Sequence, residues 1–427
     1  MNRPLRHHQF IARPARAGTV AVLDIGTSKI SCFVAVEMDA GENRVMHIKG
    51  VGYSLANGIR AGMVMDMEAA ENSIRAAVEA AERMAETTVE RVLVGISSSE
   101  LQSLTYNVNE PLNGHAVDDD ILAGVLQQAR DKCVTDQVEL LHAIPVSYKI
   151  DDSPAVQDPR GMHGEMLKVT THVMTVPVTP VRNLLLCIEK CHLEVERLMA
   201  NPYASALSCL VEDEADLGVT VIDIGAGTTS FSVFYEGVPI HTSVLPVGGH
   251  DITTDIAQAF NIPVEQAERL KLMHGSAWAD MDALNESFVI QPFGETDTQN
   301  TQSIDRAHLT RIIRPRLESI FVQVRNSLES SALNRFAGGR AVLTGGGANL
   351  SGIEDLAAQT LEKQVRIGRP MRLSGLPEAM AGPAFSASAG LVTHVYKRAQ
   401  DYLFLSDGIP SGLGVFSSIG QWLKRNF

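Results

Sequence analysis

Two short segments of the chain combine an aspartate, glycines and hydroxyl side chains, a set of groups that could bind a phosphate. The segments are DIGTSK, which starts at Asp24, and DIGAGTT, which starts at Asp223. Glycine lets backbone N–H groups approach an anionic oxygen, hydroxyls can donate hydrogen bonds as well, and a lysine adds a point charge. The predicted phosphate-binding residues are Gly26, Thr27, Ser28, Lys29, Gly225, Gly227, Thr228 and Thr229.

The aspartates of these turns have a different predicted role, because a carboxylate repels a phosphate. Asp24 and Asp223, facing the phosphate from both sides, would hold a hydrated Mg²⁺, which keeps several waters and neutralises the phosphate charge. They are about 200 positions apart, an interval typical of a domain rather than of a solenoid repeat. A single Asp-Gly turn is also a common hairpin. Its repetition predicts two similar domains that face each other.

A third glycine-rich turn, Gly345, Gly346 and Gly347 in LTGGGANL, follows an apolar run. With no side chains to obstruct it, such a turn suits a flat purine that lies on the backbone. The order of the turns along the chain, phosphate, phosphate and adenosine, predicts an ATP site.

The elements around the turns indicate an α/β fold. Each aspartate ends an apolar run and is followed by period-two alternation, which predicts a pair of strands. Strand MHIKGVGYS, a helix from Asp66 to about Ala85 and strand VERVLVGISSS then predict a partly parallel sheet. From about Leu101 to Thr175, polar hairpin-like strands around one helix indicate an insertion. A mostly helical block follows the second pair of strands.

Composition and charge limit the classes of function. A chain of 427 residues, 45% hydrophobic and 20% charged, is ordinary for a soluble globular protein with two or more cores. The formal net charge of −14 argues against general nucleic-acid binding. Five cysteines without a framework spacing fit a reducing cytoplasm, and no run of about 20 apolar residues spans a membrane. Residues 1–18 are basic without an apolar core, which predicts a disordered tail.

With these motifs the chain resembles the actin, sugar-kinase and DnaK-type ATPase superfamily, and within it the FtsA family of bacterial division proteins. Besides the three turns, the resemblance rests on GVGYSLANGIRAGMVMDMEA, VGGHDITTDIAQAF, AERLKLMHG and QVRIGRP. It covers nearly the whole chain from Thr19 and implies an actin-like (ribonuclease H-like) α/β fold. In that fold, duplicated domains flank a nucleotide cleft, and a subdomain called 1C is inserted.

The resemblance adds residues to the ATP site. Gly248 and Gly249 of VGGHD join it, and Glu268 and Lys271, one helical turn apart, would contact the ribose. An exposed ion pair is the alternative for Glu268 and Lys271.

The resemblance also divides the chain into subdomains. Subdomain 1A takes residues 19–97, 178–212 and about 370–398, subdomain 1C takes 98–177, 2A takes 213–249 and 336–369, and 2B takes 250–335. Residues 399–413 would form a linker and residues 414–427 a C-terminal amphipathic helix.

One position departs from DnaK-type and MreB-type relatives, which carry a glutamate before a proline, positioned to orient the attacking water. Here the segment reads ANPYASALSCL, with Asn201 at the matching position. An amide cannot act as a base, although it could hold a water, and phosphoryl transfer depends on positioning and metal electrostatics. We therefore expect ATP binding with at most slow hydrolysis, and we assign no catalytic residue.

The last residues, GLGVFSSIGQWLKRNF, predict an amphipathic helix. At about 100° per residue the apolar side chains fall within an arc of roughly 140°. Aromatic residues on one face and positive charge on the other are typical of a helix in a lipid interface. A last helix docked on the core is the alternative, but AQDYLFLSDGIPSGLG before it is typical of a tether. The predicted membrane-binding residues are Val415, Phe416, Ile419, Trp422, Leu423, Lys424, Arg425 and Phe427.

The resemblance implies a role in cell division. Such a protein self-assembles into protofilaments and anchors FtsZ filaments of the Z ring to anionic lipid on the cytoplasmic side of the inner membrane, where later division proteins also bind. FtsZ tails are short, acidic and partly apolar, and the helical block offers arginines near Ile320 and Phe321. The predicted tail-binding residues are Arg311, Arg314, Arg316 and Arg325, with a solvated basic face as the alternative.

Other members of the superfamily are weaker alternatives. PilM, the adaptor of type IV pilus assembly, shares a 1C-like insertion, but PilM-like proteins lack a tail of this kind. A small-molecule kinase needs a catalytic carboxylate in its cleft, which the sequence does not offer, and a DnaK-type chaperone needs a peptide-binding domain.

Overall fold

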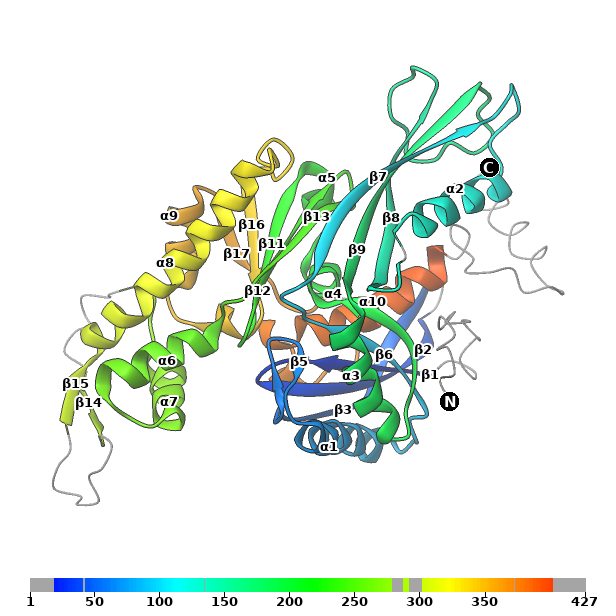
Figure 1. Cartoon of the computed structure of the whole chain (residues 1–427). Coiled ribbons are helices and arrows are strands. Elements are labelled where there is room, and N and C mark those ends of the chain that lie inside the picture. Colours follow the sequence, from blue (N-terminus) through cyan, green and yellow to red (C-terminus); the bar gives the residue numbers. More distant parts are fainter. Residues whose placement is uncertain are drawn as a thin grey trace.

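The computed structural model describes residues 19–40, 43–133, 135–278, 287–291, 302–371 and 373–401. Two five-stranded sheets, each covered by helices, form its centre (Figure 1). The first sheet has the order β10-β6-β1-β2-β3 and the second β13-β12-β11-β16-β17. The first consists of β1 (Thr19–Ile25), β2 (Lys29–Ala40), β3 (Asn43–Leu55), β6 (Arg91–Ile96) and β10 (Glu194–Ala200). The second consists of β11 (Val219–Ile224), β12 (Thr229–Tyr235), β13 (Val238–Leu245), β16 (Arg340–Thr344) and β17 (Gln364–Ile367).

The two sheets repeat one topology. β1 pairs antiparallel with β2 and parallel with β6, and β11 pairs antiparallel with β12 and parallel with β16. Asp24 and Asp223 stand at equivalent registers, opposite Ser31 and Ser230 of the following strand. The predicted pair of similar α/β domains, each built on an aspartate turn, is therefore confirmed.

Helices cover both faces of the first sheet. α1 (Met67–Ala85) and α3 (Val178–Lys190) share a core with one face, whereas α4 (Asn201–Cys209) and α10 (Ser386–Asp401) cover the other. The carboxylate of Asp66 caps α1 by accepting the N–H groups of two first-turn residues. A Cβ on Gly52 of β3 would lie 2.1 Å from the Ala77 carbonyl oxygen. Glycine therefore lets α1 lie directly on the strand.

The second domain carries the helical block predicted from the sequence. Its further elements are α5 (Glu212–Leu217), α6 (Gly249–Phe260), α7 (Val264–His274), β14 (Ser287–Ile290), β15 (Gln302–Asp305), α8 (Arg306–Ser330) and α9 (Ile353–Leu361). α8 packs against α6 and α9 and extends away from the sheet (Figure 1). The apolar residues of α8 recur every three or four positions, so one face is buried. That face comprises Leu309, Ile313, Leu317, Phe321, Val324 and Leu328.

A third unit is inserted after β6. It consists of β7 (Gln102–Pro111), α2 (Asp119–Asp131), β8 (Val138–Ile150) and β9 (Met166–Pro177), and its antiparallel sheet has the order β7-β9-β8. The predicted insertion of strands around one helix is confirmed. The insert also reaches the second domain, because the N–H of Thr242 on β13 donates to Ser103 Oγ on β7 at 3.1 Å.

Short elements complete the described chain: β4 (Ile59–Arg60), β5 (Met63–Val64) and three 3₁₀ turns, Gly346–Asn349, Glu378–Met380 and Pro383–Phe385. No helix within the described ranges is long and apolar enough to cross a bilayer. α10 continues to Asp401, so the start of the predicted linker at residue 399 is helical. The rest of that linker, the N-terminal tail and the predicted amphipathic helix lie outside the described residues.

Candidate functional site

Asp24 ends β1 with a buried carboxylate, which is only 7% exposed. Asn201 Nδ2, at the start of α4, donates to its Oδ1 at 2.7 Å, and Ser388 Oγ of α10 donates to its Oδ2 at 3.1 Å. Ser388 Oγ also lies 2.7 Å from Ser31 Oγ on β2. Two elements distant in the sequence, α4 and α10, therefore fix this carboxylate, and β2 supports Ser388.

Asp223 occupies the equivalent place in the second domain. Ser205 Oγ of α4 donates to its Oδ2. Gly345, the first glycine of the triplet, has a φ of 83° and lies directly against the other carboxylate oxygen. A Cβ at residue 345 would stand 2.2 Å from Asp223 Oδ1, so only glycine fits there. The structure thus brings the second and third predicted turns together.

The other two glycines of the triplet, Gly346 and Gly347, have different surroundings. A Cβ on Gly347 would lie 2.4 Å from Ile224 Cγ2, whereas Gly346 has no atom within 4 Å of the corresponding position. The middle glycine therefore presents an unobstructed backbone, as the purine prediction requires.

The two buried carboxylates, Asp24 and Asp223, have a nearby lysine, Lys29, to offset their negative charge. Burial raises the pKa of Asp24, against the charge of Lys29 and the hydrogen bonds from Asn201 and Ser388. Burial also raises the pKa of Asp223 to about 6, with Ser205 and Lys29 opposing the rise and Asp24 adding to it. Burial lowers the pKa of Lys29, and the two carboxylates counteract this. Two carboxylates that repel each other beside one lysine form an environment suited to a divalent cation.

The first two turns share one local geometry. The N–H of Gly26 donates to the Lys29 carbonyl at 3.1 Å, and the N–H of Gly225 donates to the Thr228 carbonyl at 2.9 Å. Thr229 differs from its prediction as a turn donor, because it is fully buried in β12 and its hydroxyl has no partner among the described residues. Its side chain belongs to the core rather than to the surface of the turn. Ser28 is exposed.

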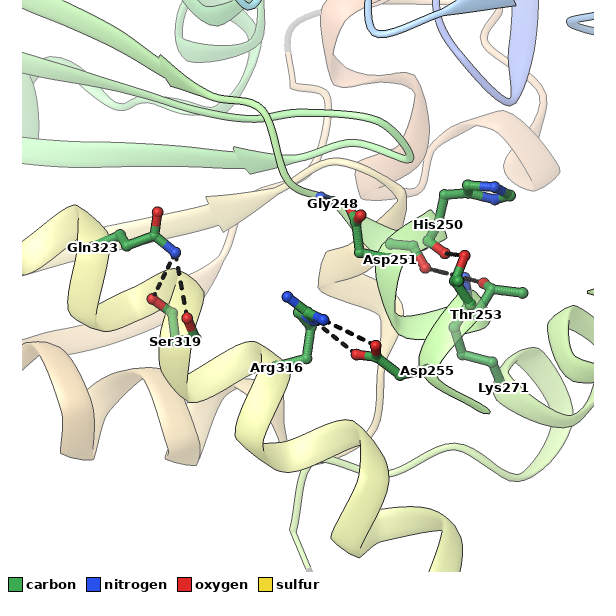
Figure 2. A network of polar contacts seen from close by, with 11 residues as sticks. Gly248, His250, Asp251, Thr253, Asp255, Lys271, Arg316, Ser319 and Gln323 are labelled. Carbon is green, nitrogen blue, oxygen red and sulfur yellow. Dashed lines mark hydrogen bonds and ion pairs between the residues drawn. The ribbon is translucent and has the colours of Figure 1, made fainter. Parts of the chain in front are cut away.

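Gly248 and Gly249 place the start of α6 against the second turn. A Cβ on Gly248 would lie 2.6 Å from the Gly225 carbonyl oxygen, and the N–H of Gly249 donates to that same oxygen at 2.9 Å. Asp251 Oδ2 accepts the N–H of Gly248 at 2.7 Å, so the aspartate side chain closes the helix start (Figure 2). The VGGHD motif is therefore adjacent to the predicted phosphate turn.

Lys271 and Glu268 form an ion pair beside this helix start. Lys271 Nζ donates to Glu268 Oε2 at 2.7 Å, to Thr253 Oγ1 at 2.7 Å and to the Gly249 carbonyl at 2.8 Å. Lys271 is only 9% exposed, so the exposed ion pair considered as the alternative describes Glu268 better than Lys271. The lysine is held against the turn by three acceptors, and its contact with a ribose stays a prediction.

Asn201 has a role that the sequence reading did not assign. Its two amide hydrogens are used, because Nδ2 donates to Asp24 Oδ1 and also to Ser97 Oγ at 2.9 Å. Its Oδ1 is buried without a hydrogen-bond partner among the described residues. Asn201 therefore holds Asp24 with one amide hydrogen and Ser97 with the other. Its Oδ1, the atom that could accept a hydrogen bond from a water, faces Gly95, where an added Cβ would lie 2.2 Å from it.

Ser205 and Ser388 were also missed. The Ser205 hydroxyl binds Asp223, and the Ser388 hydroxyl binds Asp24. Ser388 lies far from Asp24 in the sequence, and Ser205 is not part of a recognisable motif. The only sequence signal for Ser205 is its spacing, one helical turn after Asn201 in NPYASALSC.

The four arginines proposed for an FtsZ tail do not form one surface. Arg316 makes a bidentate pair with Asp255 of α6, at 2.7 and 2.9 Å (Figure 2). Arg311, Arg314 and Arg325 share a different side of α8, since successive residues rotate by about 100°. Arg316 therefore helps to hold α8 on α6.

The other three arginines have unequal surroundings. Arg311 is exposed. Arg314 pairs with Glu318 at 2.7 Å, and its guanidinium stacks over the Trp278 ring at 4.7 Å from the centroid. Arg325 donates to the Thr360 carbonyl at 3.0 Å.

The apolar partners assigned to this peptide site were wrong. Ile320 and Phe321 are both fully buried, and Phe321 belongs to the core of the second domain. They lie on the inward face of α8 and cannot contact a peptide on its surface. Among the described residues, exposed Trp278 offers an apolar side chain beside Arg314.

Two equivalent α/β domains with facing aspartate turns and a glycine triplet define an actin-like protein. Solved structures agree with this class. The PilM component of a PilM–PilN type IV pilus biogenesis complex superposes with a TM-score of 0.61 at 19% identity, covering 88% of this chain and 98% of that one. MreB5 of Spiroplasma citri, solved bound to ADP, gives a TM-score of 0.53 at 14% identity, covering 90% and 98%.

Sequence comparison identifies the family. Residues 220–390 match the family model of the cell division protein FtsA, and residues 98–175 match the SHS2 domain inserted in FtsA. The cell division protein FtsA of Agrobacterium fabrum is 39% identical over 425 residues, covering 96% of both chains. The chain belongs to the FtsA family of cell division proteins.

Proposed function

We propose that the chain binds ATP with Mg²⁺ between its two domains. The observation that supports this most strongly is the convergence of three glycine turns on two carboxylates at the domain junction. The turns keep this arrangement only with glycine, because Cβ atoms at Gly26, Gly248 and Gly345 would each lie within 2.9 Å of protein oxygens, and Gly346 has no atom within 4 Å of the corresponding position. Only glycine leaves room for close backbone approach at these positions.

Each group has a distinct proposed role. Asp24 and Asp223 hold the hydrated metal ion, whose charge offsets that of the phosphates. Lys29 and the hydroxyls of Thr27, Ser28 and Thr228 contact the phosphates, and the triplet that starts at Gly345 supports the adenine. Lys271, fixed beside Gly249, lies near enough to the second turn to serve the ribose side of the ligand.

ATP hydrolysis is expected to be slow at most. A general base or water-positioning group must reach the nucleophile. Asn201 occupies the position expected for that group, but an amide cannot act as a base, and its Nδ2 is bound to Asp24 and Ser97. Bound nucleotide would thus act mainly by setting the arrangement of the two domains.

In the cell, the proposed role is to anchor FtsZ filaments to the cytoplasmic side of the inner membrane at the division site. Membership of the FtsA family supports the division role, and the amphipathic sequence at residues 414–427 supports reversible binding to anionic lipid. Self-assembly would multiply these tails and raise avidity without new contacts. The exposed Arg311 and the neighbouring Arg314 and Trp278 are proposed to receive the acidic, partly apolar FtsZ tail.

Equilibrium titration with a fluorescent ATP analogue, with Mg²⁺ and with EDTA, tests the nucleotide proposal. Saturable, Mg²⁺-enhanced binding that unlabelled ATP displaces is the expected result. Absence of displaceable binding under both conditions would end the assignment. In that case the alternative function, a PilM-like adaptor, would be supported by the fold alone.

A further inference from the structure

α4 lies between the two sheets and reaches both site aspartates. Asn201 at its first position binds Asp24 of the first domain, and Ser205, four residues later, binds Asp223 of the second. Residues four apart lie on the same face of a helix, about 6 Å apart along its axis. One rigid element therefore contacts a carboxylate from each domain.

The position of α4 is itself tightly fixed. A Cβ on Gly390 of α10 would lie 1.7 Å from the Ala204 carbonyl oxygen, so the two helices are in direct backbone contact. Ser208 Oγ donates to the Ser386 carbonyl of α10 at 2.8 Å. The end of α4 packs into the second domain, where Cys209 shares a cluster with Val221 of β11. A shift of α4 would disturb both domains at once.

The carboxylates need the donors that α4 supplies. Ser205 is fully buried and Asn201 is 3% exposed, so water cannot readily replace either donor. A buried acceptor that loses its hydrogen bond is strongly disfavoured. Each carboxylate oxygen has two lone pairs, so the oxygens bound by α4 can still accept a hydrogen bond from the water shell of a metal ion.

We infer that Asn201 and Ser205 are positioning residues that set the two carboxylates for one hydrated metal ion, with α4 coupling the two halves of the site. This inference rests on the proposed Mg²⁺–nucleotide binding. It assigns Asn201 to metal positioning, in place of the water-orienting role expected at its position. Groups that orient metal ligands typically change metal affinity by about 10- to 100-fold when removed.

The test uses the full-length protein and the variants Asn201→Ala and Ser205→Ala. The measurements are the Mg²⁺ concentration for half-maximal ATP binding and the ATP affinity in EDTA. Each variant should raise the Mg²⁺ half-saturation about tenfold or more while changing metal-free affinity about twofold or less. A general folding defect would change both the Mg²⁺ half-saturation and the metal-free ATP affinity. Urea unfolding checks that each variant is folded. If Asn201→Ala does not fold, Ser205→Ala still tests the inference, because it removes only one oxygen atom.

Ser208→Ala is the matched control. Ser208 lies on the same helix and is 1% exposed, but it bonds to the carbonyls of Ser205 and Ser386 rather than to an aspartate. Because the backbone contact between Gly390 and Ala204 still fixes α4, the Mg²⁺ half-saturation of this variant should stay close to that of the wild type. Normal wild-type binding with unchanged half-saturation in both Asn201→Ala and Ser205→Ala would overturn the inference alone. A wild type that binds no ATP would overturn the proposed function and the inference together.

Discussion

Thr27 of the first domain and Gly227 of the second meet at the domain junction. A Cβ on Gly227 would lie 2.6 Å from Thr27 Oγ1, which also accepts the N–H of Ala61 at 3.1 Å. Because each turn belongs to a different sheet, a ligand that enters between them contacts both domains. Its binding energy therefore depends on their relative position, and binding shifts the domain arrangement in turn.

Replacing Asp223 with Leu or Gly225 with Val should abolish Mg²⁺–ATP binding. The first change removes a metal partner, and the second forces a side chain into a turn where a Cβ already lies 3.0 Å from the Thr228 carbonyl. Titration with labelled ATP measures the loss. Gly124→Ala is the control, since Gly124 of α2 has no neighbour within 4 Å of an added Cβ. Wild-type affinity in both site variants would contradict the assignment.

Charge reversal at Arg311 and Arg314 should weaken binding of an FtsZ tail peptide, because it replaces attraction to the acidic peptide by repulsion. Fluorescence anisotropy with a labelled peptide measures the effect. Arg316→Glu is a contrasting variant, which should lower the free energy of unfolding by about 1 kcal/mol by breaking the pair with Asp255. If the double reversal leaves peptide affinity intact, the tail binds elsewhere.

Stability should fall on mild acidification through His172, which joins the insert to β13. Burial, with nearby His241 adding to it and the Pro239 carbonyl opposing, lowers the pKa of His172 to about 4. The unfolded chain binds this proton near pH 6.5 and the folded one only near pH 4, so stability is full at pH 7 and lost as the pH falls between them. The contribution of His172 to the free energy of unfolding should drop by about 1–2 kcal/mol from pH 7 to pH 5, whereas the raised pKa of Asp223 acts in the opposite direction.

Urea unfolding of His172→Phe checks this assignment. That variant lacks the hydrogen bond of 2.7 Å between Ser103 Oγ and His172 Nε2 and should be less stable at pH 7, but its stability should depend less on pH. Met162→Leu, at an exposed position of the insert, changes no ionisable group and should retain the wild-type pH dependence. An identical pH slope in wild type and His172→Phe would refute the role of this histidine.

Removal of residues 411–427 should release the protein from anionic vesicles without loss of nucleotide binding. Trp422→Glu should act almost as strongly, because a charge on the apolar face opposes insertion. Changing Lys424 and Arg425 to Gln should weaken binding mainly at low salt, since exposed charges are screened. Vesicle flotation measures all three, and equal flotation of wild type, truncation and Trp422→Glu would show that the tail is not the anchor.

The positions of the turns could be predicted because their conformation depends on local residue types. Asp24 and Asp223 each end an apolar strand, and glycine follows wherever backbone must approach closely, as at Gly345. The repetition of this pattern also predicted two equivalent sheets, because both domains use one topology.

The supporting side chains could not be predicted, because their partners are set by tertiary packing. Ser388 reaches Asp24 across 364 positions of sequence, and nothing near either residue indicates that contact. The burial of Ile320 and Phe321, by contrast, is predictable from the sequence. They continue the apolar spacing of Ile313 and Leu317 along α8, and that period indicates a buried face.

Co-flotation of purified FtsZ with anionic vesicles tests the central claim most directly. FtsZ should appear in the floating fraction when full-length protein, ATP and Mg²⁺ are present, and should stay in the dense fraction with the 411–427 truncation. FtsZ that remains in the dense fraction while the full-length protein itself floats with bound nucleotide would contradict the proposal that this chain anchors FtsZ to the membrane.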